Sequence, residues 1–228
     1  MTRLVALLCL TLLAGCAHMD GILGSSGPGQ DQMANGIKQA LELSSVRASD
    51  ALSAPGGYAN DPALRIVFPE QLQTVTNAMR QFGMGRYVDQ VESLMNQGAE
   101  QAATEAKALF VGAVRNMTVT DALGIVRGDD TAATDYFRTH TESSLRERYQ
   151  PIIRRNLEQV GFYDEYRLML DVYNTLPIRN RLNLDLENYV LNRSLDGLFS
   201  RVAAEEKLIR QDPLGHGSSL IASIFQRR

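Results

Sequence analysis

The chain has 228 residues, of which 44% are hydrophobic and 21% charged, and it contains seven prolines and no tryptophan. This composition excludes a collagen-like, a largely disordered or a multi-span membrane protein. The formal net charge is −3, and only three of the 23 basic residues are lysines. We therefore do not expect a general nucleic-acid-binding protein, because such proteins need a basic patch that follows the phosphate backbone.

Residues 1–15 have the pattern of a secretory signal peptide: Arg3 precedes an apolar run, and small residues close the segment. The run is too short to cross a bilayer, which takes roughly 20 helical residues. The string Leu13-Ala14-Gly15-Cys16 resembles the lipobox of bacterial lipoproteins, in which the cysteine is acylated and becomes the new N-terminus. We identify Cys16 as the lipidation site. The alternative is a cysteine that follows a signal peptide by chance.

Lipidation at Cys16 implies a membrane partner and a location in the bacterial cell envelope. Ala17, rather than an aspartate, follows Cys16, and among lipoproteins this implies the periplasmic face of the outer membrane. Two or three acyl chains make such attachment stable. Once residues 1–15 are removed, Cys16 is the only cysteine left, so no disulfide forms and stability must come from core packing.

Residues 16–32 are rich in glycine and serine, and this composition predicts a flexible tether with an end-to-end distance of about 20 Å. The folded domain is expected over residues 33–228. Helical periodicity predicts a first helix over residues 33–52, followed by an extended loop over 54–69. A second helix then places four apolar residues on one packed face before Gly83 stops it. These residues are Leu72, Val75, Met79 and Phe82.

A longer helix is predicted over residues 87–116. The middle of its apolar face consists of small residues such as Gly98 and Ala102, which allow a neighbouring helix to approach closely, so we expect this helix at the centre of the domain. Thr118 and Asp121 have the spacing of a capping box, which predicts a short helix that ends before Gly128.

The second half of the chain also has helical patterns. We expect Asp129–Thr131 to cap a helix over residues 132–139, Thr141 to cap another, and Pro151 to divide the stretch up to Gly161. Three further helices are indicated: one from about Tyr166 to before Pro177, a long one opened by Asn183 or Asp185 and ending at Gln211, and a final turn capped by Ser218 or Ser219.

No segment alternates apolar and polar residues long enough to predict a sheet. The fold class is therefore all-α, a single domain of about seven to nine helices.

The residues that several reaction classes require do not occur. Glu-x-x-His, His-Glu-x-x-His, Gly-x-Ser-x-Gly, a Walker loop and Cys-x-x-Cys are all missing from the chain. We assign His18 to the tether, His140 to a link between helices and His216 to a glycine-rich loop, each with a structural or solvated role. No metal or other cofactor is expected.

Carboxylates are the remaining candidates for chemistry. On the C-terminal helix, Glu206 falls within an apolar stripe and Glu205 lies at its edge, and a buried carboxylate needs a partner. Arg210 lies one helical turn beyond Glu206, and Arg201 one turn before Glu205. Both a structural ion pair and a functional acid in a pocket are consistent with this spacing.

The candidate site is a polar pocket; the polar side chains of residues 131–136 and 196–210 either share it or only tie helices together. Capping alone explains Asp121, and Asp135 can pair with Arg138 at the next turn. The candidate residues are Asp121, Thr131, Asp135, Asp196, Glu205, Glu206 and Arg210.

Most aromatic residues fall in the second half of the chain. They are predicted to form core or, alternatively, a groove for an apolar ligand or a partner helix. The set is Tyr136, Phe137, Tyr149, Phe162, Tyr163, Tyr166, Tyr173, Tyr189, Phe199 and Phe225.

Several strings resemble the DUF4197 family of bacterial envelope proteins over about residues 33–226. They are Ile66-Val-Phe-Pro-Glu, Met117-Thr-Val-Thr-Asp, Gly128-Asp-Asp-Thr-Ala-Ala-Thr-Asp-Tyr-Phe, Leu195-Asp-Gly-Leu-Phe and Glu205-Glu-Lys-Leu-Ile-Arg-Gln-Asp-Pro. The resemblance implies a helical, exported domain of uncharacterised function. The chain departs from the family pattern in Met95–Glu100, where Gln97-Gly98 replaces the expected basic and small residues.

Two functions are consistent with this sequence. The preferred one is a lipid-anchored binding, interaction or structural module of the envelope, with another envelope protein or an apolar ligand as partner. The alternative is a hydrolase or lyase that uses Glu206 with Asp121 or Asp135 as acid and base.

Overall fold

The computed structural model describes residues 29–158 and 185–217, together with residues 163, 166, 167, 171, 219, 221 and 222. Every regular element within these residues is a helix, which confirms the all-α class. In chain order they are α1 (Gln30–Ser53), the 3-10 helix η1 (Glu70–Leu72), α2 (Gln73–Gln81), α3 (Gly85–Ala103), α4 (Ala106–Asn116), α5 (Val119–Arg127), α6 (Ala132–Glu158), α8 (Leu186–Gln211) and α9 (Pro213–His216).

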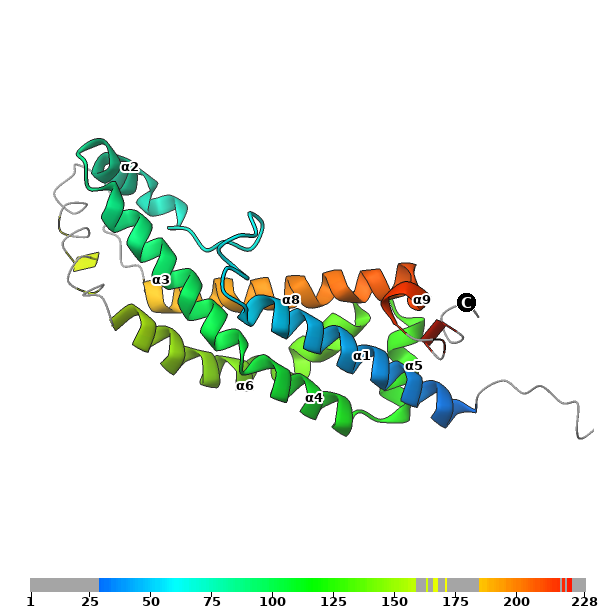
Figure 1. The fold of residues 1–228 in the computed structure, drawn as a ribbon. Coiled ribbons are helices and arrows are strands. Elements are labelled where there is room, and N and C mark those ends of the chain that lie inside the picture. Colours follow the sequence, from blue (N-terminus) through cyan, green and yellow to red (C-terminus); the bar gives the residue numbers. More distant parts are fainter. Residues whose placement is uncertain are drawn as a thin grey trace, which may run out of the picture.

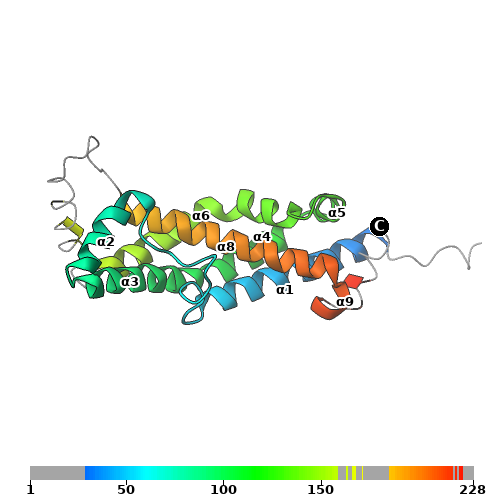
Figure 2. The same cartoon turned by 90° about the horizontal axis from the view of Figure 1, so that it is seen from above.

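The long helices lie side by side in an elongated bundle (Figures 1 and 2). α6 packs between α3 and α8, while α1 contacts α4, α5 and α8. The start of α1, the end of α8, α5 and α9 lie at one end of the bundle, and α2 with the turn into α3 lies at the other. The two ends of the bundle therefore carry different parts of the chain.

Aromatic side chains fill the centre of the bundle. The Phe110 ring lies 4.9 Å from the Phe137 ring and 6.2 Å from the Phe199 ring, measured between centroids, and all three side chains are fully buried. Tyr149 is buried as well. These contacts join α4, α6 and α8. Of the predicted aromatic set, Phe137, Tyr149 and Phe199 form core, whereas Tyr163 is 36% exposed. Phe162, Tyr173 and Phe225 lie outside the described residues.

Small residues bring α3 and α6 close together, as the sequence predicted. A Cβ atom added to Gly98 would lie 3.4 Å from Asn156 Cβ and 3.7 Å from Ile153 Cα. Ala99 and Ala102 are completely buried. A larger side chain at Gly98 would push the two helices apart.

The single helix predicted over residues 87–116 is wrong, because α3 ends at Ala103 and α4 begins at Ala106. Thr104 N–H and Glu105 N–H donate to carbonyls three residues earlier, and the Thr104 hydroxyl donates to the Gln101 carbonyl at 2.7 Å. The backbone thus tightens to a 3-10 turn at Thr104 and Glu105, and this turn separates the two helices.

The division of residues 132–161 is also wrong, because α6 is continuous and contains Pro151. Thr141 caps nothing, since its hydroxyl donates to the Phe137 carbonyl at 2.6 Å inside the helix. A proline within a helix costs about 3 kcal/mol. Tyr149 and Ile153, both fully buried, lie on either side of Pro151 and hold that part of α6 against the core.

The first helix, the loop that follows it and the start of α8 agree with the predictions. α1 matches the first predicted helix, residues 54–69 form a loop, and the Asp185 side chain caps α8. Phe82 is an exception: it was expected on the packed face of α2, yet its side chain is 79% exposed. The helix predicted before Pro177 and the final turn near Ser218 fall largely outside the described residues.

The loop over residues 54–69 crosses α3 and α8 and is held by buried contacts. The Tyr58 hydroxyl donates to the Ser194 carbonyl at 2.7 Å, and the Tyr58 ring packs on Gly197. A Cβ atom at Gly197 would lie 2.6 Å from the Tyr58 ring. The absence of a side chain at Gly197 is therefore what allows the loop to dock on α8.

Among the described helices, none is by itself both long and apolar enough to cross a bilayer. One bent pair, Gly85–Asn116 with Val119–Arg127, meets the length and composition criteria together, with a bend of 106°.

Replacing Gly197 by alanine should destabilise the protein by about 1–3 kcal/mol, because the buried Tyr58 ring cannot move away without breaking its hydrogen bond. Gly112→Ala is the matched control, since an added Cβ there meets nothing within 4 Å and alanine favours helix by up to about 1 kcal/mol. Urea denaturation of both variants measures the difference. Equal stability of the two variants would contradict the packing described for Tyr58.

Candidate functional site

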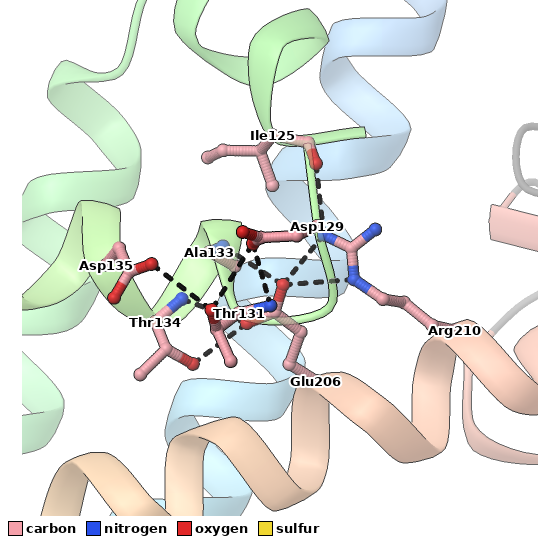
Figure 3. Close-up of polar contacts among 8 residues, drawn as sticks. All are labelled: Ile125, Asp129, Thr131, Ala133, Thr134, Asp135, Glu206 and Arg210. Carbon is pink, nitrogen blue, oxygen red and sulfur yellow. Dashed lines mark hydrogen bonds and ion pairs between the residues drawn. The ribbon is translucent and has the colours of Figure 1, made fainter. Parts of the chain in front are cut away.

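The central feature of the candidate site is Glu206, which reaches from α8 to the first turn of α6 (Figure 3). Its Oε1 accepts from Ala133 N–H at 3.0 Å, and its Oε2 accepts from Thr134 N–H at 2.9 Å and from the Thr134 hydroxyl at 2.8 Å. The first N–H groups of a helix have no partner within the helix. Glu206 supplies that partner from another helix, and its negative charge lies at the positive end of the helix dipole.

Arg210 completes this network from one turn further along α8. It donates to Glu206 Oε1 through Nη2 at 2.7 Å and through Nε at 3.0 Å, and Nη2 also donates to the Ile125 carbonyl at 3.0 Å. The side chains of Glu206 and Arg210 are 5% and 7% exposed. The pair predicted from the sequence is thus confirmed, and it joins α5, α6 and α8.

Thr131 lies at the edge of the network without reaching Glu206. Its hydroxyl donates to Asp129 at 3.3 Å and to Asp135 at 3.2 Å. The expected pair of Asp135 with Arg138 is wrong, because Arg138 pairs with Glu142 and stacks over the Phe199 ring, with 4.3 Å from its guanidinium carbon to the ring centroid. Asp135 and Thr131 therefore order the turn that precedes α6.

The other candidate residues lie elsewhere. Asp196 faces Arg138 at 3.9 Å, and Glu205 pairs with Arg201 at 3.1 Å, as its spacing predicted. Asp121 forms the predicted capping box of α5: its Oδ2 accepts from Thr118 N–H at 3.0 Å and from the Thr118 hydroxyl at 2.7 Å. Of the seven residues, Glu206 and Arg210 bond each other, and Thr131 and Asp135 form a second bonded pair beside them.

A small cavity of about 20 Å³ borders Glu206 and Arg210. Apart from those two and Ser44, its lining is apolar: Ile37, Ala40, Leu41, Ile125, Ala133 and Ile209. A volume of this size holds about one water molecule. An ionised carboxylate offers about four acceptor positions, and the five hydrogen bonds to Glu206 use them. The arrangement therefore joins helices and leaves Glu206 no position from which to take a proton from a substrate.

The histidines give no metal centre in the described part of the chain, where no group of three His, Cys, Asp or Glu side chains could hold an ion. His140 does not link two helices as expected but lies within α6, where its ring stacks on Tyr136 at 4.0 Å and its Nδ1 lies 2.8 Å from the Tyr136 carbonyl. His216 belongs to α9, and His18 lies outside the described residues.

A second polar cluster, which the sequence analysis missed, holds the loop over residues 54–69. Glu92, Asn96 and Glu100 follow each other at intervals of four on α3, and all three are buried. The Asn96 amide accepts from Ile66 N–H at 2.9 Å and donates to the Ile66 carbonyl at 2.8 Å. Glu100 accepts from the N–H groups of Tyr58 and Ala59 at 3.2 and 3.3 Å, and Glu92 pairs with Arg65 at 3.5 Å. The cluster could have been predicted from the sequence, because these polar residues recur at intervals of four on a helix face that also buries Val91 and Met95.

A family model described as "Protein of unknown function (DUF4197)" matches residues 27–226. The chain belongs to this family. No curated protein and no solved structure matches it.

The structure explains what two of the strings that resemble the DUF4197 family do in the fold. Met117-Thr-Val-Thr-Asp contains the capping box of α5, and Leu195-Asp-Gly-Leu-Phe contains the glycine on which Tyr58 packs. The segment Met95–Glu100, where the sequence analysis expects a departure from the family pattern, carries Asn96 and Glu100, which bind the loop, and Gly98, which contacts α6.

Glu206→Ala should destabilise the protein by about 3–5 kcal/mol, because it leaves the buried Arg210 guanidinium without its carboxylate. Glu205→Ala is the matched control: the Glu205 side chain is 8% exposed, but its partner Arg201 on the same helix is 37% exposed and can be hydrated, so we expect a smaller loss than at Glu206. Urea denaturation measures both. Glu206→Gln, which keeps one acceptor oxygen, should fall between the two, and a Glu206→Ala protein as stable as Glu205→Ala would contradict a structural role.

The hydrogen bond from the Thr118 hydroxyl, with a further bond from Thr118 N–H, lowers the pKa of the Asp121 carboxyl below its ordinary value. Such a carboxylate stabilises the fold above its unfolded-state pKa, and this contribution is lost as pH falls through the folded-state pKa. Thr118→Ala should raise the pKa of Asp121, as measured by NMR titration. Thr120→Ala, an exposed threonine in the same turn, should leave it unchanged. An unshifted pKa in Thr118→Ala would contradict this explanation.

Proposed function

We propose that the chain is a lipoprotein of the bacterial cell envelope, anchored through acylated Cys16 at the periplasmic face of the outer membrane, and that its helical domain is a binding or structural module. The lipobox-like string before Cys16 supports the anchor. The start of α1 at one end of the bundle is consistent with it, because the chain enters the folded domain there (Figure 1).

The saturated carboxylate of Glu206 is the observation that favours binding over catalysis. A general acid or base has to reach the proton that it transfers. Glu206 instead accepts five hydrogen bonds from residues of its own domain, and the adjoining cavity of about 20 Å³ is far smaller than the roughly 300–1,000 Å³ of ordinary ligand pockets. Asp121 and Asp135 are engaged in separate turns, so the acid–base pair of the hydrolase or lyase alternative does not converge.

Replacing Cys16 by serine should abolish the incorporation of labelled palmitate and release the protein from the membrane fraction, because the acylated sulfur is gone. Cys9→Ser is the matched control: Cys9 lies within the apolar run of the signal segment and should not be acylated. Labelling and fractionation of both variants in a bacterial host test the anchor. Wild-type protein without label, or Cys16→Ser protein that still incorporates label, would contradict it.

A further inference from the structure

The turn between α2 and α3 exposes a cluster of large apolar side chains. Phe82 is 79% exposed, Tyr87 49% and Met84 39%. We call residues 82–87 the apolar tip. An exposed phenylalanine flanked by two further large apolar residues is costly to keep in water, and such clusters mark interaction sites.

Three N–H groups of the apolar tip donate to carbonyls of the tip itself or of the end of α2. Met84 N–H donates to the Met79 carbonyl at 2.8 Å, and Gly83 N–H donates to the Arg80 carbonyl at 3.3 Å. This pair of bonds is the Schellman arrangement, and Gly83 makes it possible with φ of 79°. Tyr87 N–H donates to the Met84 carbonyl at 3.1 Å. The turn can therefore enter an apolar phase without desolvating these three N–H groups, whose loss of partners would be costly.

The charges of the apolar tip are arranged behind the exposed rings. Arg80 is held back along α3, where it pairs with Asp89 and lies 3.8 Å from Glu92. Arg86 is exposed in the first turn of α3, where the helix dipole adds partial positive charge. Aromatic residues beside an exposed arginine are typical of protein segments that lie in a membrane interface, where rings enter the acyl boundary and cations meet phosphate groups.

We propose that the apolar tip is a second membrane contact, which inserts Phe82, Met84 and Tyr87 into the interface of a bilayer with anionic phospholipids. Two observations favour a bilayer over a protein partner or a second copy of the chain. The N–H groups of Gly83, Met84 and Tyr87 already have partners, which suits a fluid apolar phase, and the exposed Arg86 complements anionic phosphate.

The orientation of the domain on the membrane rests on the proposed anchor at Cys16, whereas the insertion of the tip does not depend on that anchor. The apolar tip and the start of α1 lie at opposite ends of the bundle (Figures 1 and 2). The 27 residues of α6 make a helix of about 40 Å. A domain attached to the membrane at one end by Cys16 and at the other by the tip lies along the bilayer instead of extending away from it.

The chain has no tryptophan, so Phe82→Trp places a single fluorescent probe in the apolar tip. The full chain is mixed with vesicles of phosphatidylethanolamine and phosphatidylglycerol, with and without bromine on the acyl chains. The tryptophan emission of Phe82→Trp should move to shorter wavelength and be quenched by the brominated lipid. Val67→Trp is the control, because Val67 is 40% exposed on the loop over residues 54–69 and is not part of the tip, and the emission of this variant should not be quenched.

A pair of neighbouring substitutions tests the apolar contribution. Phe82→Ser should weaken vesicle binding by about tenfold or more, since it removes a largely exposed aromatic ring that would be buried in the interface. Gln81→Ser changes the adjacent exposed residue and should leave binding unchanged. Because Phe82 packs little within the fold, both variants should unfold at the same urea concentration as the wild type.

Three outcomes with the Phe82→Trp variant would overturn the proposal: emission that stays unquenched in vesicle-bound protein, a blue shift that depends on protein concentration without lipid, or a blue shift that requires another envelope protein. The second would assign the tip to self-association and the third to a protein partner. The anchor is scored separately by palmitate labelling of Cys16. Quenching at position 82 in a Cys16→Ser background distinguishes failure of the anchor from failure of the tip.

Discussion

The arrangement of this domain depends on one carboxylate that acts at a distance in sequence. Glu206 supplies to α6 the hydrogen-bond acceptors that a helix usually obtains from its own N-cap, although it lies 73 residues from Ala133. Arg210 neutralises the carboxylate and at the same time binds the carbonyl of Ile125 at the end of α5. The first turn of α6, the last part of α5 and the C-terminal half of α8 therefore share one buried network. Since α6 packs on both α3 and α8, the position of its first turn fixes much of the bundle.

The sequence predicted the ion pair within α8, but it did not predict the hydrogen bonds that Glu206 accepts from α6. Glu206 and Arg210 are four residues apart on one helix, a spacing that requires no knowledge of the fold. The bonds to Ala133 and Thr134 depend on how α8 crosses α6, which no local pattern encodes. The capping box of Thr118 and Asp121 and the cap of Asp185 were predictable for the same reason as the ion pair.

Tertiary packing explains where local expectations were wrong. Pro151 favours a break, yet the burial of Tyr149 and Ile153 holds α6 continuous across it. At Thr104 nothing in the pattern of apolar residues marks a boundary, yet a tightened turn separates α3 from α4. Phe82 fits the apolar spacing of α2 and is nevertheless exposed, because α2 ends at Gln81 and the turn carries the ring outward.

The loop over residues 54–69 joins parts of the chain that are remote from each other. Its contacts link Ile66 to Asn96 across 30 positions and Tyr58 to Ser194 across 136. Contacts of such long range can form only after the helices that they bridge have assembled, so the loop should dock late in folding. For the same reason the loop can detach locally without unfolding the bundle. Its release would expose Glu100 and Asn96 on α3 while the helices beneath stay packed.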